Sequence, residues 1–157
     1  MNALPGLLAL LVLGAIGSWL DITQRRLPNW LSGIALLLGL IGAAALGGAA
    51  AGGWHALHAG AGLVVGMGLY AIGAIGAGDA KYYAGMAAWF PFEEGLRLFV
   101  AVSMSGLVLL IVSVSIRLVS GRKVLAGRGE GQEGLPYGVA IAGGAALLAL
   151  QTYLIPA

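Results

Sequence analysis

The sequence predicts an all-α fold, a polytopic bundle of about six transmembrane helices of roughly 20 residues each. Hydrophobic residues make up 60% of the 157 residues and charged residues only 9%, whereas soluble domains carry about 25% charged residues. The mean hydropathy is +0.97. This length leaves little chain for a globular extramembrane part, so we expect residues 1–157 to form a single transmembrane domain.

Composition also excludes several classes of function. The chain has no cysteine, which rules out disulfides, thiolate catalysis and cysteine zinc sites. The net charge of +2 does not indicate nucleic-acid binding. The 28 glycines suit close helix packing in lipid. Gly48-x-x-x-Gly52 and Gly62-x-x-x-Gly66 have the spacing of helix-packing motifs, although so glycine-rich a chain also produces such spacings by chance.

Apolar segments, taken in chain order, define the expected helices. The first runs from Leu4 to Leu20 and lacks both a basic start and a signal-peptidase site, so it is expected to stay in the membrane. The second covers 30–50 and follows Pro28-Asn29, because proline favours a helix start and the tryptophan after it favours the membrane interface. A turn over 52–55 is expected to separate it from a third helix over 56–75.

The fourth segment, Ala80 to Phe90, is short for a membrane crossing. As a helix of about 11 residues it would rise only about 17 Å, against a hydrocarbon core of about 30 Å. Two further spans are expected over Leu96–Val119 and Pro136–Leu154, joined by a loop over 117–134 that is rich in charge and glycine.

The basic residues favour a crossing for the 80–90 segment, because lysine and arginine accumulate in cytoplasmic loops. If the segment crosses, seven of the eight basic residues lie on one side of the membrane, and otherwise this bias largely disappears. We therefore expect both termini on the outer, non-cytoplasmic side of the inner membrane and the basic loops in the cytoplasm. The seven residues are Arg25, Arg26, Lys81, Arg117, Arg122, Lys123 and Arg128.

Asp21 and Asp79 are the acidic residues that directly adjoin apolar spans. An ionised carboxylate at membrane depth costs several kcal/mol, so each is a functional-site candidate. Between them the chain leaves the cytoplasmic face and returns to it, which places both on one face. Held a few ångströms apart, they would share a proton and titrate as a pair. One could then activate a water for attack on a peptide carbonyl while the other protonates the carbonyl oxygen, as in aspartic proteases.

The neighbours of these acids have expected roles of their own. Gly76 and Gly78 permit an unwound backbone and a close approach of the substrate. Lys81 could offset the charge of the pair, but snorkelling to the lipid headgroups is the favoured interpretation. Taken singly, each aspartate could instead cap a helix or pair with Arg25, Arg26 or Lys81.

Two other groups of residues are functional candidates. His55 and His58, beside Trp54, suggest a metal site, but no third ligand lies nearby and the topology puts them on the outer face. We therefore expect interfacial polar residues and no metal there. Pro136 and Tyr137 are expected to start the last helix and anchor it at the interface, with a tyrosine hydroxyl that reaches the active-site water as the alternative.

Three motifs together resemble the prepilin peptidases, which are membrane aspartic proteases marked by a Gly-x-Gly-Asp motif. Asp21 with the run 25–29, Arg-Arg-Leu-Pro-Asn, looks like the family's first motif, an aspartate at the end of the first span. The run 76–81, Gly-Ala-Gly-Asp-Ala-Lys, resembles the second, which carries the other catalytic aspartate. The run 135–142, which begins Leu-Pro-Tyr-Gly, is similar to the segment that opens the family's last span. The likeness covers essentially the whole chain.

The resemblance implies that Asp21 and Asp79 are catalytic and that no metal or organic cofactor takes part. It implies cleavage of the basic leader peptide of prepilin or pseudopilin precursors at the cytoplasmic membrane face, with membrane lipids as the other partner. The short length places the chain nearest the compact CpaA/TadV-like branch, which serves Flp-type tight-adherence pili. The supporting motif residues that it implies are Gly76, Gly78, Lys81, Arg25, Arg26, Pro28, Asn29, Pro136 and Tyr137.

Two features depart from the family's pattern. Larger bacterial members carry an insertion with paired cysteines between the first two spans and also methylate the new pilin N-terminus, whereas this chain has a short loop there and no cysteine. This difference counts against methylation. Leu27 stands where isoleucine is common.

Two alternative functions stay open from the sequence. One is a small proton-coupled transporter or assembly subunit that uses Asp21 and Asp79 as a proton relay. The other keeps the enzyme class and changes the substrate, to a preflagellin or a secretion pseudopilin.

Overall fold

The computed structural model describes residues 4–119 and 135–154, and the part it describes contains helices and no strand. The predicted all-α class is therefore confirmed. The predicted loop over 117–134 lies almost wholly outside the described residues. In chain order the elements are α1 (Leu4–Gln24), α2 (Asn29–Ala71), α3 (Ala77–Ala87), the short 3-10 helix η1 (Phe92–Glu94), α4 (Gly95–Val119) and α5 (Tyr137–Leu154).

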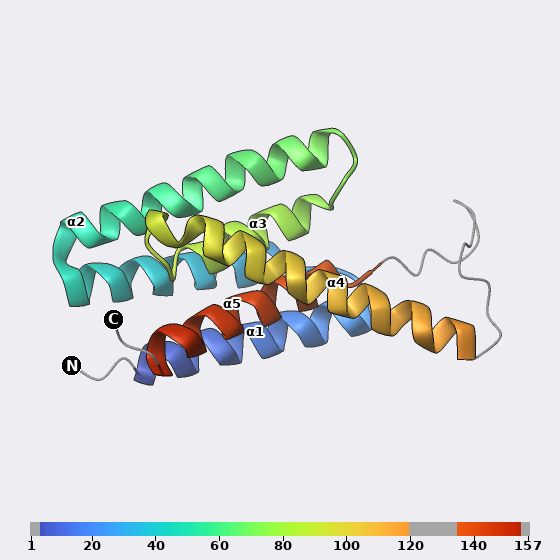
Figure 1. Ribbon diagram of the computed structural model, residues 1–157. Coiled ribbons are helices and arrows are strands. Elements are labelled where there is room, and N and C mark those ends of the chain that lie inside the picture. Colours follow the sequence, from blue (N-terminus) through green and yellow to red (C-terminus); the bar gives the residue numbers. More distant parts are fainter. Residues whose placement is uncertain (1–3, 120–134, 155–157) are drawn as a thin grey trace.

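Helix α2 is a hairpin of two helical arms that reverses at Gly48. The backbone of Gly48 has φ 76° and ψ −176°, a conformation that side-chain-bearing residues rarely adopt. The residues before it form a first arm (29–47), and those after it form a second arm (49–71) that runs back alongside the first (Figure 1). The predicted turn over 52–55 is wrong, because these residues are helical in the second arm.

The two glycines and the tryptophan at 52–54 favour a helix boundary there, whereas the reversal depends on the left-handed backbone of Gly48. Immediately after the turn, Gly52 lies against the first arm, where an added Cβ would come within 3.2 Å of the Cβ of Ala44. The Gly48-x-x-x-Gly52 spacing therefore belongs to the turn of the hairpin, not to a contact between separate helices.

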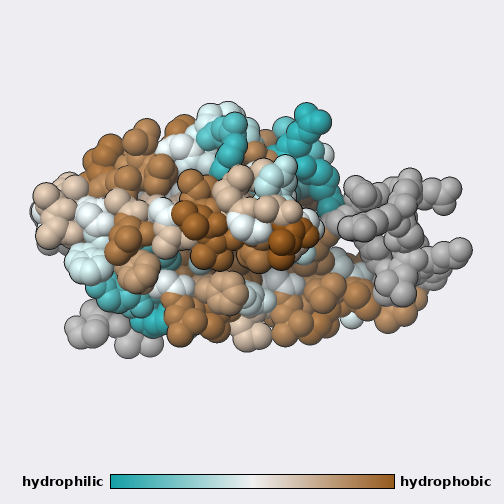
Figure 2. All heavy atoms as spheres, turned by 90° about the horizontal axis from the view of Figure 1, so that it is seen from above, coloured by the Kyte–Doolittle hydropathy of each residue, from teal (hydrophilic) through white to brown (hydrophobic). Residues whose placement is uncertain are grey.

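Successive segments alternate in direction, so the C-terminal end of α1 and the first turns of α3 and α5 lie at one end of the bundle (Figure 1). Among the described residues, three helical stretches are long and apolar enough to cross a membrane, namely Leu4–Gln24, Asn29–Ala71 and Phe92–Ile116, and Tyr137–Thr152 is a shorter apolar helix. Hydrophobic residues cover most of the face shown in Figure 2, with hydrophilic residues in clusters towards its margins. The chain is thus an integral membrane protein, while about six crossings remain a prediction.

Helix α3 lies between the two arms of α2, and glycines make the close approach possible. A Cβ at Gly39 of the first arm would lie 2.8 Å from the backbone of Ala88, and one at Gly66 of the second arm would lie 2.9 Å from the Cβ of Ala80. The Gly62-x-x-x-Gly66 spacing is therefore a packing surface for α3. With 11 residues α3 rises only about 17 Å. Protein surrounds it, so its length need not match the bilayer.

Helices α1 and α5 pack side by side below this layer (Figure 1). Tyr82 of α3 connects the two layers: its side chain is fully buried, and its hydroxyl donates a hydrogen bond of 3.2 Å to the carbonyl oxygen of Leu13 in α1. The hydroxyl rests directly on Gly17, where a side chain would collide with it. The core is completed by Leu10, Leu31, Met86, Phe90, Leu98, Ile141 and Leu148.

Candidate active site

Asp21 is a buried acid in the last turn of α1, and it is held by the first turn of α5. Its side chain is 7% exposed, and its Oδ2 accepts a hydrogen bond of 2.7 Å from the backbone N–H of Gly138. The N–H groups of a first helical turn lack partners inside the helix, so a carboxylate is favoured there. An added Cβ at Gly138 would lie only 2.9 Å from the same oxygen, so this contact requires glycine.

Asp79 lies in the first turn of α3 and is half-buried. Its Oδ2 accepts a hydrogen bond of 3.1 Å from the backbone N–H of Gly76, the residue that precedes the helix. Asp79 therefore does cap a helix, which was one of the alternatives for a single aspartate. The cap uses one oxygen of the carboxyl group.

An unwound backbone was predicted at both Gly76 and Gly78, and the structure has it at Gly76 alone. Gly76 is extended, with φ −78° and ψ 151°, but Gly78 is helical within α3. Gly78 packs against Leu27, where an added Cβ would lie 3.4 Å from the carbonyl oxygen, an ordinary van der Waals contact. The left-handed glycine of this segment is Gly73, with φ 76°, which the motif did not single out.

The two acids lie at the same end of the bundle and within electrostatic range of each other, since the charge of Asp21 acts on Asp79. Leu27 links their surroundings. A Cβ added at Gly138 would lie 3.0 Å from Cδ1 of Leu27, and one added at Gly78 would lie 3.6 Å from Cβ of Leu27. The charge of Arg25 also acts on Asp21. Two like-charged groups that act on each other resist ionising together.

Lys81 connects the first two motifs of the sequence. Its Nζ donates a hydrogen bond of 3.1 Å to Oδ1 of Asn29, the first residue of α2. Pro28 precedes that helix in an extended conformation. Lys81 and Asn29 are both exposed, and this partner for Lys81 was not foreseen from the sequence. Arg25, with φ 53°, and Arg26 lie on the exposed turn between α1 and α2.

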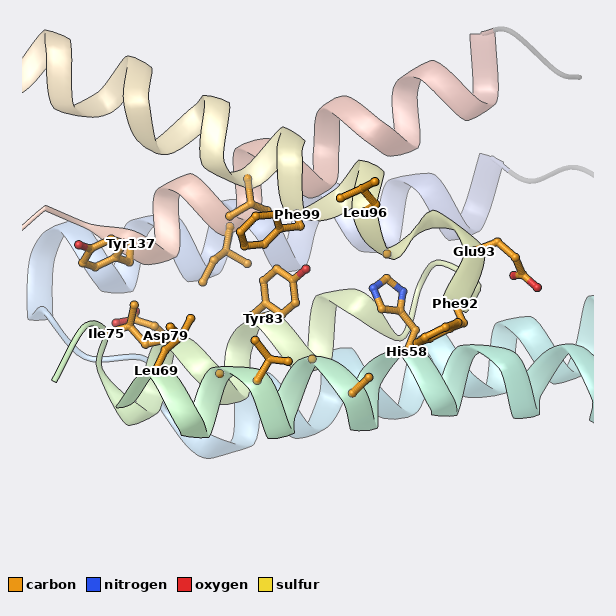
Figure 3. Close-up of a pocket in the computed structure, with 17 residues that line it drawn as sticks. His58, Leu69, Ile75, Asp79, Tyr83, Phe92, Glu93, Leu96, Phe99 and Tyr137 are labelled. Atoms are coloured by element: carbon orange, nitrogen blue, oxygen red, sulfur yellow. The ribbon is translucent and has the colours of Figure 1, made fainter. Parts of the chain in front are cut away.

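An apolar pocket of about 730 Å³ opens beside Asp79 between the second arm of α2, α3, α4 and the start of α5. We call it the lateral groove. Asp79 and Tyr137 line one end, whereas His58, Phe92 and Glu93 line the other (Figure 3). Asp21 is not among its lining residues. Of the two acids, Asp79 is thus the one that a molecule in the groove would meet.

The two histidines are structural in this fold. His55 Nδ1 lies 2.9 Å from the carbonyl oxygen of Ala88, and His58 Nδ1 lies 3.0 Å from that of Phe90. They hold the C-terminal end of α3 and the turn after it, so His58 is buried and is not an interfacial polar residue as predicted. No group of three or more metal-ligating side chains occurs within the described ranges.

Two residues near the acids were missed from the sequence as parts of the site. Gly138 was seen only within a motif, and its N–H bond to Asp21 depends on how α5 packs against α1. Tyr82 has no role in the prediction from the sequence, although it is buried and lies close enough to Asp21 for the two groups to interact electrostatically. The sequence signal that could have indicated a role for Tyr82 is its position beside Lys81 on a glycine-rich helix.

The model of the type IV leader peptidase family matches residues 8–111 of this chain. The matched range includes Asp21 and Asp79 and ends before the segment that contains Gly138. No curated protein and no solved structure gives a match.

Proposed function

Because the chain belongs to the type IV leader peptidase family, we propose that it is a membrane aspartic endopeptidase that removes the leader peptide of type IV prepilins. Cleavage takes place at the cytoplasmic face of the inner membrane, where Asp21 and Asp79 act as a pair. The observation that supports this most strongly is geometric. The C-terminal end of α1, which carries Asp21, and the first turn of α3, which carries Asp79, lie at the same end of the bundle, and Leu27 lies beside both sites.

The reaction follows from two carboxyl groups that share one proton. The ionised member removes a proton from a water molecule, whose oxygen attacks the carbonyl carbon of the scissile peptide bond. The protonated member donates its proton to the carbonyl oxygen, which gives a tetrahedral intermediate. When the C–N bond breaks, the proton taken from the water passes to the leaving amine. One hydroxyl group of the intermediate gives its proton back to the second acid as the new carboxyl group forms, so the pair returns to its starting state.

The hydrogen bonds around the site would fix the orientation of the two carboxyl groups. Gly138 N–H fixes one oxygen of Asp21, and Gly76 N–H fixes one oxygen of Asp79, in each case at Oδ2. The backbone N–H of Val139 also acts on the Asp21 carboxyl group, so Oδ1 of Asp79 is the oxygen that we expect to meet the water. We assign positioning roles to Lys81 and Asn29, whose hydrogen bond ties the start of α2 to the first turns of α3.

We further propose that the substrates are prepilins of the Flp tight-adherence type and that the new N-terminus is left unmethylated. One observation supports this: α1 and α2 are joined by the four residues 25–28, without cysteine.

The test is to co-express the chain with an Flp-type prepilin and to determine the N-terminal residue and mass of the product. The proposal predicts a shortened pilin whose mass is that of the unmodified chain. Asp21→Asn and Asp79→Asn are each expected to lower cleavage by about 100-fold or more, while both proteins still insert. Glu94→Gln, at the opposite end of the bundle, is the control and retains cleavage. Normal cleavage by either aspartate variant would contradict the mechanism.

A further inference from the structure

The lateral groove continues well beyond the acid that proteolysis requires. It follows α3 from Asp79 in its first turn to Phe92, which lies past its last residue. The 11 residues of α3 correspond to about 17 Å. Charged side chains occur only at the two ends, Asp79 at one and Glu93 at the other (Figure 3). The wall between them is apolar apart from the Tyr83 ring with its hydroxyl and the histidine near the far end.

The two long walls of the groove are stripes with helical spacing. They belong to the second arm of α2 and to α4, and α4 has α5 as its main backbone neighbour. The α4 stripe is well exposed, with Leu96 at 74%. The α2 stripe contains small residues that let another backbone come close. The stripe on α2 is His58, Ala61, Gly62, Val65, Gly66 and Leu69, and that on α4 is Gly95, Leu96, Phe99 and Val102.

We infer that the lateral groove seats an apolar α-helix of the precursor, which starts next to the scissile bond at Asp79 and runs along α3 towards Phe92. The inference rests on the proposed function and names the part of the substrate that the groove binds. The groove is continuous with the proposed catalytic acid, so a chain cleaved at Asp79 has one of its two flanks in line with the groove.

The chemistry of the walls decides which flank this is and what conformation it has. A basic leader would lose its hydration against an apolar wall without a partner for each charge. An extended peptide would leave its N–H and C=O groups unpaired there, whereas a helix satisfies them internally. Over about 17 Å a helix makes about three turns, so the groove recognises the first turns of an apolar helix downstream of the bond.

The first test compares two neighbouring valines of α2. Val65 lines the groove and is 60% exposed, whereas Val64 is 74% exposed and does not line it. Val65→Trp is expected to fill the groove and to slow cleavage of a full-length prepilin by about tenfold or more. The same variant should cleave normally a peptide that contains the leader and the cleavage site but ends before the apolar segment. Val64→Trp should behave as the wild type with both substrates.

The second test uses the absence of native cysteine in this chain. Single cysteines at Val65 or at Val64 are introduced together with Asp79→Asn, which keeps the prepilin uncleaved, and are oxidised with prepilins that have one cysteine in the apolar segment. We expect disulfides with position 65, recurring every three to four positions of the prepilin as in a helix, and none with position 64.

The outcomes separate this inference from the proposed function. If the wild type cleaves the prepilin but Val65→Trp cleaves it equally fast, or position 65 forms no disulfide, the groove does not bind the helix and the peptidase assignment stands. If a bound lipid occupies the groove while the prepilin is cleaved, the groove likewise does not bind the helix, and the peptidase assignment stands. If the wild type does not cleave the prepilin at all, both proposals fall.

Discussion

The two acids of the site are held in different ways. Asp21 is buried and bonds to a residue 117 positions away in the chain, whereas Asp79 is half-buried and bonds to a residue three positions away. The geometry at Asp79 therefore forms with its own helix. The geometry at Asp21 exists only once α5 has packed against α1, so the relation between the two acids depends on that helix pair.

The two helix contacts that carry these acids also differ in tightness. Helix α3 meets the arms of α2 through glycines that leave no room for a methyl group, as at Gly39, Gly66 and Gly85. Helices α1 and α5 meet more loosely at Gly14, where an added Cβ would lie 3.5 Å from the Cβ of Ala142, and become tight only at Gly138 beside Asp21. A change at Gly138 should therefore affect the reaction more than the fold.

Among the variants that test this comparison, Gly138→Ala is expected to have the largest effect, a loss of prepilin cleavage. Its Cβ would meet Asp21 Oδ2 at 2.9 Å and Leu27 Cδ1 at 3.0 Å, so the carboxyl group must shift. A misplacement of this kind can cost about 100-fold in rate. We expect prepilin cleavage to fall by about 10- to 100-fold while the protein still inserts. Gly33→Ala, with no atom near its added Cβ, is the control. Unchanged cleavage in Gly138→Ala would show that Asp21 does not need this bond.

Gly85→Ala tests the tight contact of α3 instead. An added Cβ would lie 2.6 Å from the carbonyl oxygen of Ser32 in the first arm of α2, and that backbone cannot easily move. We expect the free energy of unfolding in detergent to fall by about 1–3 kcal/mol. Gly60 lies in open space on the second arm, so Gly60→Ala should not lower the free energy of unfolding in this way. Equal stability of the two variants would mean that α3 is not tightly enclosed.

Tyr82→Phe tests the connection between the two layers. The change removes the hydroxyl that donates to the carbonyl oxygen of Leu13. Loss of one such bond costs about 0.5–1.5 kcal/mol, which thermal unfolding can measure. Tyr70→Phe, at a tyrosine that is 47% exposed, should leave stability unchanged. A Tyr82→Phe protein as stable as the wild type would rule out a role for this bond.

The smallest effect is expected for the exposed Lys81–Asn29 bond. Lys81→Met and Asn29→Ala are each expected to lower kcat for prepilin cleavage by about two- to fivefold, because exposed polar pairs contribute up to about 1 kcal/mol. The double variant should be no worse than either single variant, since both remove the same bond. Additive losses would show that the two residues act separately.

The sequence predicted the helical class, the membrane setting and the family, because these depend on apolar runs and on short motifs. It misplaced the hairpin turn, because the reversal depends on the left-handed backbone of Gly48, which a glycine-rich sequence does not distinguish from its other glycines. It missed the partner of Asp21 and the buried hydroxyl of Tyr82, because both depend on contacts between helices that are distant in the chain.

The central claim is that Asp21 and Asp79 act as one unit, and a double-mutant comparison tests it most directly. Cleavage rates of a prepilin are measured for Asp21→Asn, Asp79→Asn and the protein with both changes. Residues that act as a unit give losses that do not add, so we predict that each single variant is as slow as the double variant. A single variant that keeps substantial activity, or a double variant far slower than both, would contradict the paired mechanism.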